Sequence, residues 1–89
     1  MIRRDVIYSG RVQGVGFRWT TKHIAANYSV TGSVENRDDG TVFLAVEGEK
    51  DEVAAFMEAI ATRMKTNIRE TLVNEGIPKG ADTEFKVRY

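Results

Sequence analysis

The sequence predicts an α+β fold in which two helices cover one face of a single antiparallel sheet. Three observations lead to this prediction. A glycine-rich turn joins a β-rich run to a helical run, an Asp-Gly pair separates two runs of alternating polarity, and a second amphipathic helical run follows. A chain of 89 residues buries about two-thirds of its unfolded surface at most, so we expect a single domain over residues 1–89 with one core.

The first part of the chain predicts a strand and a helix. Residues 6–8 form a short β-rich run that ends at Ser9-Gly10, which is typical of a strand followed by a turn. Apolar or semi-apolar residues then recur over residues 17–28 with the spacing of one helix face. We therefore expect a strand, a glycine-rich turn and a helix in this order.

The middle of the chain predicts a hairpin. Residues 30–35 and 41–47 alternate between apolar and polar side chains, as half-buried strands do. Asp39-Gly40 lies between the two runs, and an Asp-Gly pair flanked by strands is a strong hairpin signal.

The remainder predicts a second amphipathic helix, which apolar residues from Val53 to Met64 mark and which has acidic residues in its first turn and basic residues in its last. A less regular strand over 67–74, a loop over 76–82 and a final strand over 85–89 follow. The order β-α-β-β-α-β with a short last strand is the ferredoxin-like arrangement. Right-handed crossovers then place both helices on one face of the sheet. They also place the turn after the first strand beside the start of the first helix.

The composition narrows the class of protein. Thirteen basic and thirteen acidic residues cancel, which argues against a nucleic-acid coat or a membrane-surface protein. The chain has no cysteine, which suits a reducing compartment, and its charged N-terminal residues do not form the apolar segment of a signal peptide. We therefore expect a cytoplasmic monomer that binds neither nucleic acid nor membrane.

Residues 10–18 carry the strongest functional signal. Three glycines within seven residues allow the backbone to turn its N–H groups inward, and Arg18 follows where the helix begins. Such N–H groups together with a guanidinium form a site for an oxyanion, and Gln13 could help to orient it. The pattern is not a dinucleotide fingerprint, because Trp19 occupies the third glycine position, and it is not a Walker motif. The residue types alone leave open an ordinary turn beside a solvated arginine.

Several polar residues have structural explanations. Asn36 stands at a strand end before a turn, where asparagine is common, so by itself it is a turn residue. Asp38 and Asp39 have no second acidic cluster that would complete a metal site. His23, the only histidine, has no catalytic motif around it and is expected at the surface.

The aromatic residues are expected to pack rather than to bind. Trp19 and Tyr28 share the first helix, so we expect them in the core or at its edge. Phe43 alternates out of step with its apolar neighbours, which places it on the open face of the sheet.

Several motifs together resemble the acylphosphatase family. They are Gly10-Arg11-Val12-Gln13-Gly14-Val15-Gly16-Phe17-Arg18, Gly32-x-Val34-x-Asn36-x-x-x-Gly40-x-Val42, Gly48 and the ending Phe85-x-Val87-x-Tyr89. The resemblance covers nearly the whole chain. It implies a ferredoxin-like fold and hydrolysis of carboxyl-phosphate mixed anhydrides, with Arg18 and Asn36 as catalytic residues. The phosphate-binding residues that it implies are Gln13, Gly14, Val15, Gly16, Phe17 and Arg18.

The chain departs from the family pattern at a few positions. Ser29 replaces a common glycine, Ser33 replaces a common aromatic residue, and Glu35 replaces a basic or polar residue. A Gly-Pro pair common after the second helix is missing around residues 65–67. None of these departures affects Arg18 or Asn36, although Glu35 would slightly weaken the attraction of an anion.

The chemistry of an acyl phosphate suits what the chain contains. Its leaving group is a stable carboxylate, so no general acid is needed, and water can attack phosphorus directly. Phosphoryl transfer chiefly requires positioning and charge stabilisation, which the loop, Arg18 and Asn36 would supply. We therefore expect no metal and no cofactor.

Two other functions remain open at this stage. The domain could bind an anion without turnover, or serve a larger carbamoyl-transfer protein; the presence of both Arg18 and Asn36 favours the enzyme. An RNA-binding ferredoxin-like domain needs aromatic residues on its strands and a basic face, and only Phe43 is a suitable aromatic.

Overall fold

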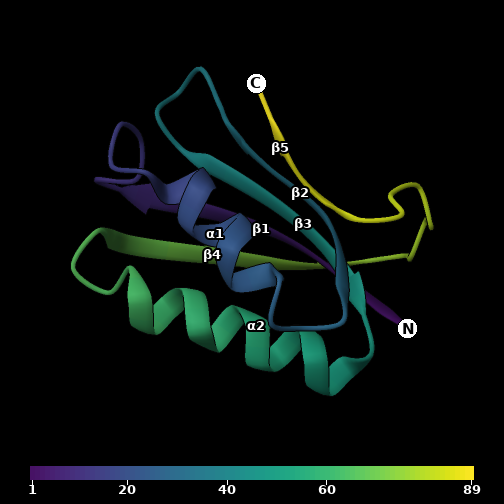
Figure 1. Ribbon diagram of the computed structural model, residues 1–89. Coiled ribbons are helices and arrows are strands. Elements are labelled where there is room, and N and C mark those ends of the chain that lie inside the picture. The colour runs from purple at the N-terminus through teal and green to yellow at the C-terminus, as the bar shows by residue number, and fades with distance from the viewer.

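Five strands form one sheet, and both helices lie against the same face of it (Figure 1). The computed structural model describes every residue from 1 to 89. In chain order the elements are β1 (Ile2–Gly10), α1 (Phe17–Ala25), β2 (Val30–Asn36), β3 (Val42–Gly48), α2 (Lys50–Arg63), β4 (Ile68–Gly76) and β5 (Phe85–Arg88). The strands are ordered β4-β1-β3-β2-β5 across the sheet. The predicted ferredoxin-like arrangement is confirmed.

The sheet is mixed, so the prediction of a wholly antiparallel sheet is wrong at one edge. β5 pairs parallel to β2, with Phe85 opposite Gly32 and Arg88 opposite Glu35, whereas all other neighbouring strands are antiparallel. The reason is the direction of the chain. β4 ends at the end of the sheet where β2 begins, because Gly76 is opposite Arg3. A chain that crosses to the far edge at that end must run in the direction of β2.

Two element boundaries differ from the sequence prediction for identifiable reasons. β1 begins at Ile2 rather than at residue 6, because its charged first residues pair with strands on both sides. Because residues 3–5 are all charged, the alternation of apolar and polar side chains that marks a strand is absent there. α1 ends at Ala25, and Tyr28 follows in the turn that leads into β2.

One hydrophobic core fills the space between the sheet and the helices. Alternate residues of the central strands point toward the helices, as the strand period requires. Phe56 of α2 is fully buried and contacts Phe85 of β5 edge-on, with 5.4 Å between ring centroids. The core side chains with 1% exposure or less are Val6, Val12, Val34, Val42, Leu44, Val46, Val53, Phe56 and Ile60.

The aromatic residues divide between core and surface. Trp19 is 61% exposed, so its predicted place in the core is wrong. Phe17 is buried, and a residue two positions later in a helix points about 200° around the axis, away from the core. Tyr28 is half-buried at the edge of the core, as predicted. Phe43 is half-buried on the open face beneath the guanidinium of Arg37, 4.3 Å from the ring centroid.

Glu47 binds the segment that crosses the open face of the sheet between β4 and β5, residues 77–84. Its carboxylate is 5% exposed and accepts hydrogen bonds from the backbone N–H groups of Lys79 at 3.0 Å and Gly80 at 3.1 Å. It also pairs with the guanidinium of Arg3 at 2.7 Å. Burial by itself raises the pKa of the Glu47 carboxyl, but the hydrogen bonds from Lys79, Gly80 and Arg3 outweigh it and hold that pKa below its ordinary value.

Neither helix is long and apolar enough to cross a lipid bilayer.

We predict that Glu47→Gln lowers the free energy of unfolding by about 2 kcal/mol at pH 7, because the N–H groups of Lys79 and Gly80 and the Arg3 guanidinium lose a charged acceptor, although Asp5 still pairs with Arg3 at 3.0 Å. The folded-state pKa is lowered, so the unfolded chain takes up the proton first as the pH falls. The contribution of Glu47 is therefore complete above about pH 4.5 and disappears as the pH falls through the folded-state pKa. Urea unfolding at several pH values between 3 and 7 measures this dependence.

Glu75→Gln is the matched control. Glu75 pairs with Arg4 at 3.4 Å, but its side chain is 82% exposed, and such surface pairs contribute little. Equal losses for the two variants at pH 7, or a Glu47→Gln loss that does not shrink in acid, would contradict the role assigned to Glu47.

Candidate functional site

The loop between β1 and α1 has a backbone that glycine makes possible. Gly14 and Gly16 have φ angles of 74° and 77°, in the left-handed region. A side chain at either position would meet no atom within 4 Å, so the requirement lies in the backbone conformation rather than in space. Gly16 is also the N-cap of α1, and no side chain caps this end of the helix. The first N–H groups of α1 therefore remain available to a ligand.

Hydrogen bonds fix the start of this loop, while the backbone N–H groups at its centre have no partner in the protein. Asn67 and Arg11 exchange two hydrogen bonds, Arg11 N–H to the Asn67 carbonyl at 2.9 Å and the Asn67 amide to the Arg11 carbonyl at 3.1 Å. The backbone N–H groups of residues 13–17 donate to no other protein group. Such a row of free donors at a helix N-terminus is suited to an anion.

Gln13 holds the loop against the β2–β3 hairpin. Its side-chain amide nitrogen donates to the backbone carbonyls of Arg37 at 2.7 Å and Thr41 at 2.8 Å. Both amide hydrogens are thus used within the protein. The expectation that the Gln13 side chain orients a ligand is therefore not met, and the side chain positions the loop instead.

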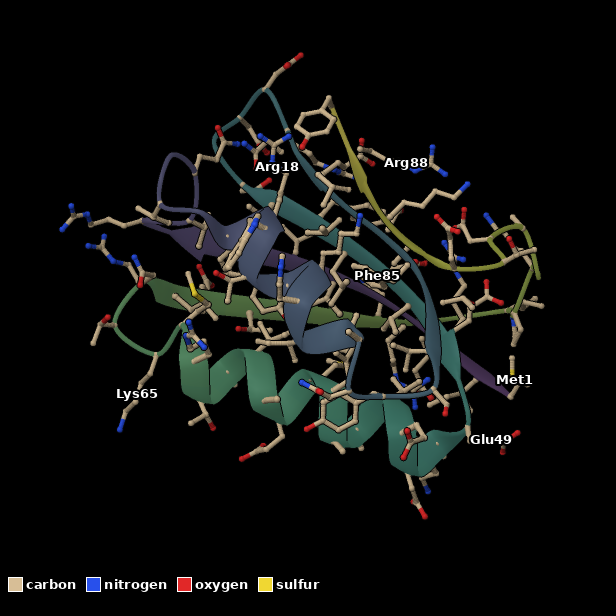
Figure 2. All side chains as sticks on the ribbon, in the orientation of Figure 1. Met1, Arg18, Glu49, Lys65, Phe85 and Arg88 are labelled. Atoms are coloured by element: carbon tan, nitrogen blue, oxygen red, sulfur yellow. The ribbon has the colours of Figure 1, made fainter.

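Arg18 lies in the first turn of α1 and is held by the C-terminal strand. One of its guanidinium nitrogens donates to the Arg88 carbonyl at 3.1 Å, and its central carbon lies 4.8 Å from the centroid of the Tyr89 ring. Figure 2 shows Arg18 extending from α1 toward the C-terminal end of β5, where Arg88 lies. This contact uses one of the five N–H donors of the guanidinium and leaves four for a ligand.

Sequence reasoning missed the contribution of β5 to the site. The only available signal was the ending Phe85-x-Val87-x-Tyr89, which marks a strand but does not identify its neighbours.

Asn36 ends β2 on the face that carries the helices. Its side-chain oxygen is shielded from solvent, and no protein group donates a hydrogen bond to it. A buried acceptor without a donor costs about 1–3 kcal/mol, so such an atom calls for an explanation. Asn36 and Arg18 line the same cleft, although the shielded oxygen itself is not open to it.

The cleft lies between α1 and β5 and has a volume of about 630 Å³. It brings together Gly14, Gly16 and Phe17 of the predicted phosphate-binding residues, with Arg18 and Asn36. Gln13 and Val15 do not line it. Its other lining residues are Val12, Trp19, Lys22, His23, Glu84, Lys86, Val87 and Tyr89. Three cationic side chains and one carboxylate give the cleft a charge that favours an anion.

His23 is exposed, as the sequence predicts, but it also forms part of the cleft wall. Its Nδ1 lies 2.9 Å from the carbonyl oxygen of Trp19. Because a carbonyl only accepts, Nδ1 carries the proton. The imidazole stacks on the indole of Trp19 with 3.7 Å between centroids and an angle of 27°. The structure contains no group of three or more His, Cys, Asp or Glu side chains that could hold a metal ion.

These features define a ferredoxin-like protein with a cleft, lined by three cationic side chains, at the N-terminus of its first helix. The family model for acylphosphatase matches residues 4–87, and the chain therefore belongs to the acylphosphatase family, which is a family of enzymes.

The comparisons include relatives over the whole chain and over part of it. An acylphosphatase of Listeria welshimeri is 50% identical over 91% of this chain and 85% of its own length. One of Lacticaseibacillus paracasei is 46% identical over 66% of this chain, and the match spans 63% of that protein. The crystal structure of acylphosphatase from Bacillus subtilis covers all of both chains with a TM-score of 0.88 and 31% identity.

A longer protein also contains this fold. A full-length HypF crystal structure in a phosphate- and nucleotide-bound form matches 99% of this chain with 29% identity and a TM-score of 0.79. The match covers 12% of the HypF chain.

We predict that inorganic phosphate binds the cleft and raises the melting temperature. A ligand at 100 times its Kd stabilises the folded state by about 2.7 kcal/mol. Arg18→Ala removes the cation of the site, and Arg18→Lys replaces the planar fork with a point charge, so both should weaken phosphate binding at least tenfold. Thermal unfolding at a series of phosphate concentrations gives the affinities.

Arg11→Ala is the matched control, because Arg11 is exposed in the same loop but does not line the cleft. It should bind phosphate as the unaltered protein does. An equal loss of affinity in Arg11→Ala and Arg18→Ala would show that phosphate responds only to the general charge of the loop.

Proposed function

We propose that this protein hydrolyses acyl phosphates to a carboxylate and inorganic phosphate. The observation that carries the proposal is the shared cleft, which Asn36 and Arg18 both line beside the free N–H groups of the loop. The cleft thus combines a cation and free N–H donors with an uncharged polar side chain. Family membership agrees with this activity.

The phosphoryl group binds in the loop between β1 and α1. The N–H groups of the loop and the N-terminus of α1 bind its oxygens, and Arg18 adds charge-assisted hydrogen bonds. These donors are fixed before the substrate arrives, because Gln13, Asn67 and β5 hold the loop and the guanidinium. Donors that need no rearrangement stabilise the charge of the transition state efficiently.

A water molecule attacks phosphorus directly. The side-chain amide of Asn36, which lines the cleft, hydrogen-bonds to this water and so positions it for attack on phosphorus. The bond between phosphorus and the acyl oxygen breaks, and its electron pair leaves with the carboxylate. One proton of the water passes to a phosphate oxygen, so the products are a carboxylate and inorganic phosphate.

The reaction needs no metal and no general acid. The leaving carboxylate is the conjugate base of an acid with an ordinary pKa near 4, so it departs without a proton.

We also propose that the protein acts as a cytoplasmic monomer and that residues 1–89 form a single domain.

A domain that binds its anion without turnover is the second candidate function. The match to a small part of HypF favours it, because there the fold occurs within a longer chain. Initial rates on acetyl phosphate distinguish the two functions, since a binding module would show phosphate affinity without turnover.

We predict that Asn36→Ala lowers kcat by about 10²-fold or more, because the contact with the attacking water is made chiefly in the transition state. The inhibition constant for phosphate should stay nearly unchanged. Steady-state rates on acetyl phosphate, phosphate inhibition and the melting temperature are measured on the same sample. Asn74→Ala, an exposed change in β4, serves as the control. A normal kcat with a lowered melting temperature would make Asn36 a turn residue.

We predict that a chelator leaves hydrolysis of acetyl phosphate unchanged. Phosphate monoesters should react far more slowly, because their alkoxide leaving group needs a general acid that the cleft does not offer. Rates with and without EDTA, and on a phosphate monoester beside acetyl phosphate, test both statements. Loss of activity in EDTA with recovery in magnesium would overturn the proposed mechanism.

A further inference from the structure

The part of the cleft beyond Arg18 carries a further inference, which rests on the proposed function. Arg18 and Lys22 are four residues apart on α1, as are Trp19 and His23, so the four side chains share one face of the helix. All four line the cleft. The phosphoryl end of a substrate occupies the loop end of the cleft, and its acyl group therefore extends along this face.

Trp19 presents an exposed and well-positioned aromatic surface there. The indole is 61% exposed, although α1 buries Phe17, Thr20, Thr21 and Ala25 on its other side. The His23 ring stacks on it and is tied to the Trp19 carbonyl at 2.9 Å. A large aromatic side chain with only two rotatable side-chain bonds loses little entropy on binding a ligand.

The opposite wall of the cleft adds a second aromatic ring. Tyr89 follows β5 and is fully exposed, and its ring lies 4.8 Å from the Arg18 guanidinium. Val87 lines the same wall. Aromatic surface thus lies on both sides of the residue that holds the phosphoryl group.

The charges around the acyl end are nearly balanced. Lys86 pairs with Asp82 at 3.6 Å, and Glu84 lines the same wall. Lys22 has no ion pair, and Glu84 contributes one carboxylate to the lining of the same cleft. Besides Lys22, this part of the cleft offers exposed aromatic surface to a ligand.

We propose that Trp19 is a specificity-determining residue that favours acyl phosphates with an aromatic acyl group. The aromatic ring of the acyl group contacts the part of the indole that His23 does not cover, while the phosphoryl group remains in the loop. The acyl group does not change on passing to the transition state, so this contact acts on substrate binding and alters KM rather than kcat. A small acyl group such as acetyl does not reach the indole.

The test compares benzoyl phosphate with acetyl phosphate. Trp19→Ala should raise KM for benzoyl phosphate about fivefold, the size expected of one aromatic contact, while kcat on both substrates and KM for acetyl phosphate stay within about twofold. Trp19→Phe keeps a stacking ring and should restore most of the preference. Ile77→Ala, which changes an 83% exposed apolar residue that does not line the cleft, should leave both substrates unaffected.

The outcomes are distinct. Equal changes on the two substrates in Trp19→Ala, or failure of Trp19→Phe to restore the preference, would overturn the role of Trp19 while leaving the proposed function intact. Absence of turnover on either substrate in the unaltered protein would overturn the proposed function, and the role of Trp19 with it.

Discussion

The parallel pairing of β5 with β2 is the contact on which the cleft depends. It brings the Arg88 carbonyl and the Tyr89 ring to the guanidinium of Arg18, and it supplies the wall that faces α1. The pairing is reached only because the chain crosses the sheet after β4. Glu47 holds that crossing through two backbone N–H groups and Arg3. A carboxylate on the open face thus stabilises the geometry of a cleft at the far end of the same strands.

The cleft combines free donors with a rigid support. The unpaired buried oxygen of Asn36 lowers the stability of the folded state, whereas the unpaired N–H groups lie in a loop whose residues 14–16 are exposed. The hydrogen bonds of Gln13 and Asn67 fix the surrounding backbone and limit that cost. Free polar groups in a fixed frame are what a preorganised site requires, because the ligand then meets donors that need not move.

Trp19 and Gln13 show how a residue type can mislead when its surroundings are unknown. Tryptophan in an amphipathic helix usually packs inward, yet the position of Trp19 around α1 turns it toward the cleft. A glutamine within a loop of small residues suggests contact with a ligand, yet the hairpin carbonyls take both hydrogens of Gln13. The partners of Gln13 are distant in sequence, whereas the exposure of Trp19 follows from which face of α1 packs on the sheet.

Local patterns in the sequence determined the order of the elements, the glycine-rich turn and the Asp-Gly hairpin, whereas Arg18 and Asn36 became catalytic candidates only through the resemblance to a family. These features depend on backbone preferences and side-chain periods over a few residues, which the sequence records directly. Only the tertiary structure decided that β5 runs parallel to β2, that Glu47 holds the crossing and that Arg18 meets a carbonyl 70 positions away. Such contacts depend on which surfaces meet after the chain has packed, and no local pattern encodes that choice.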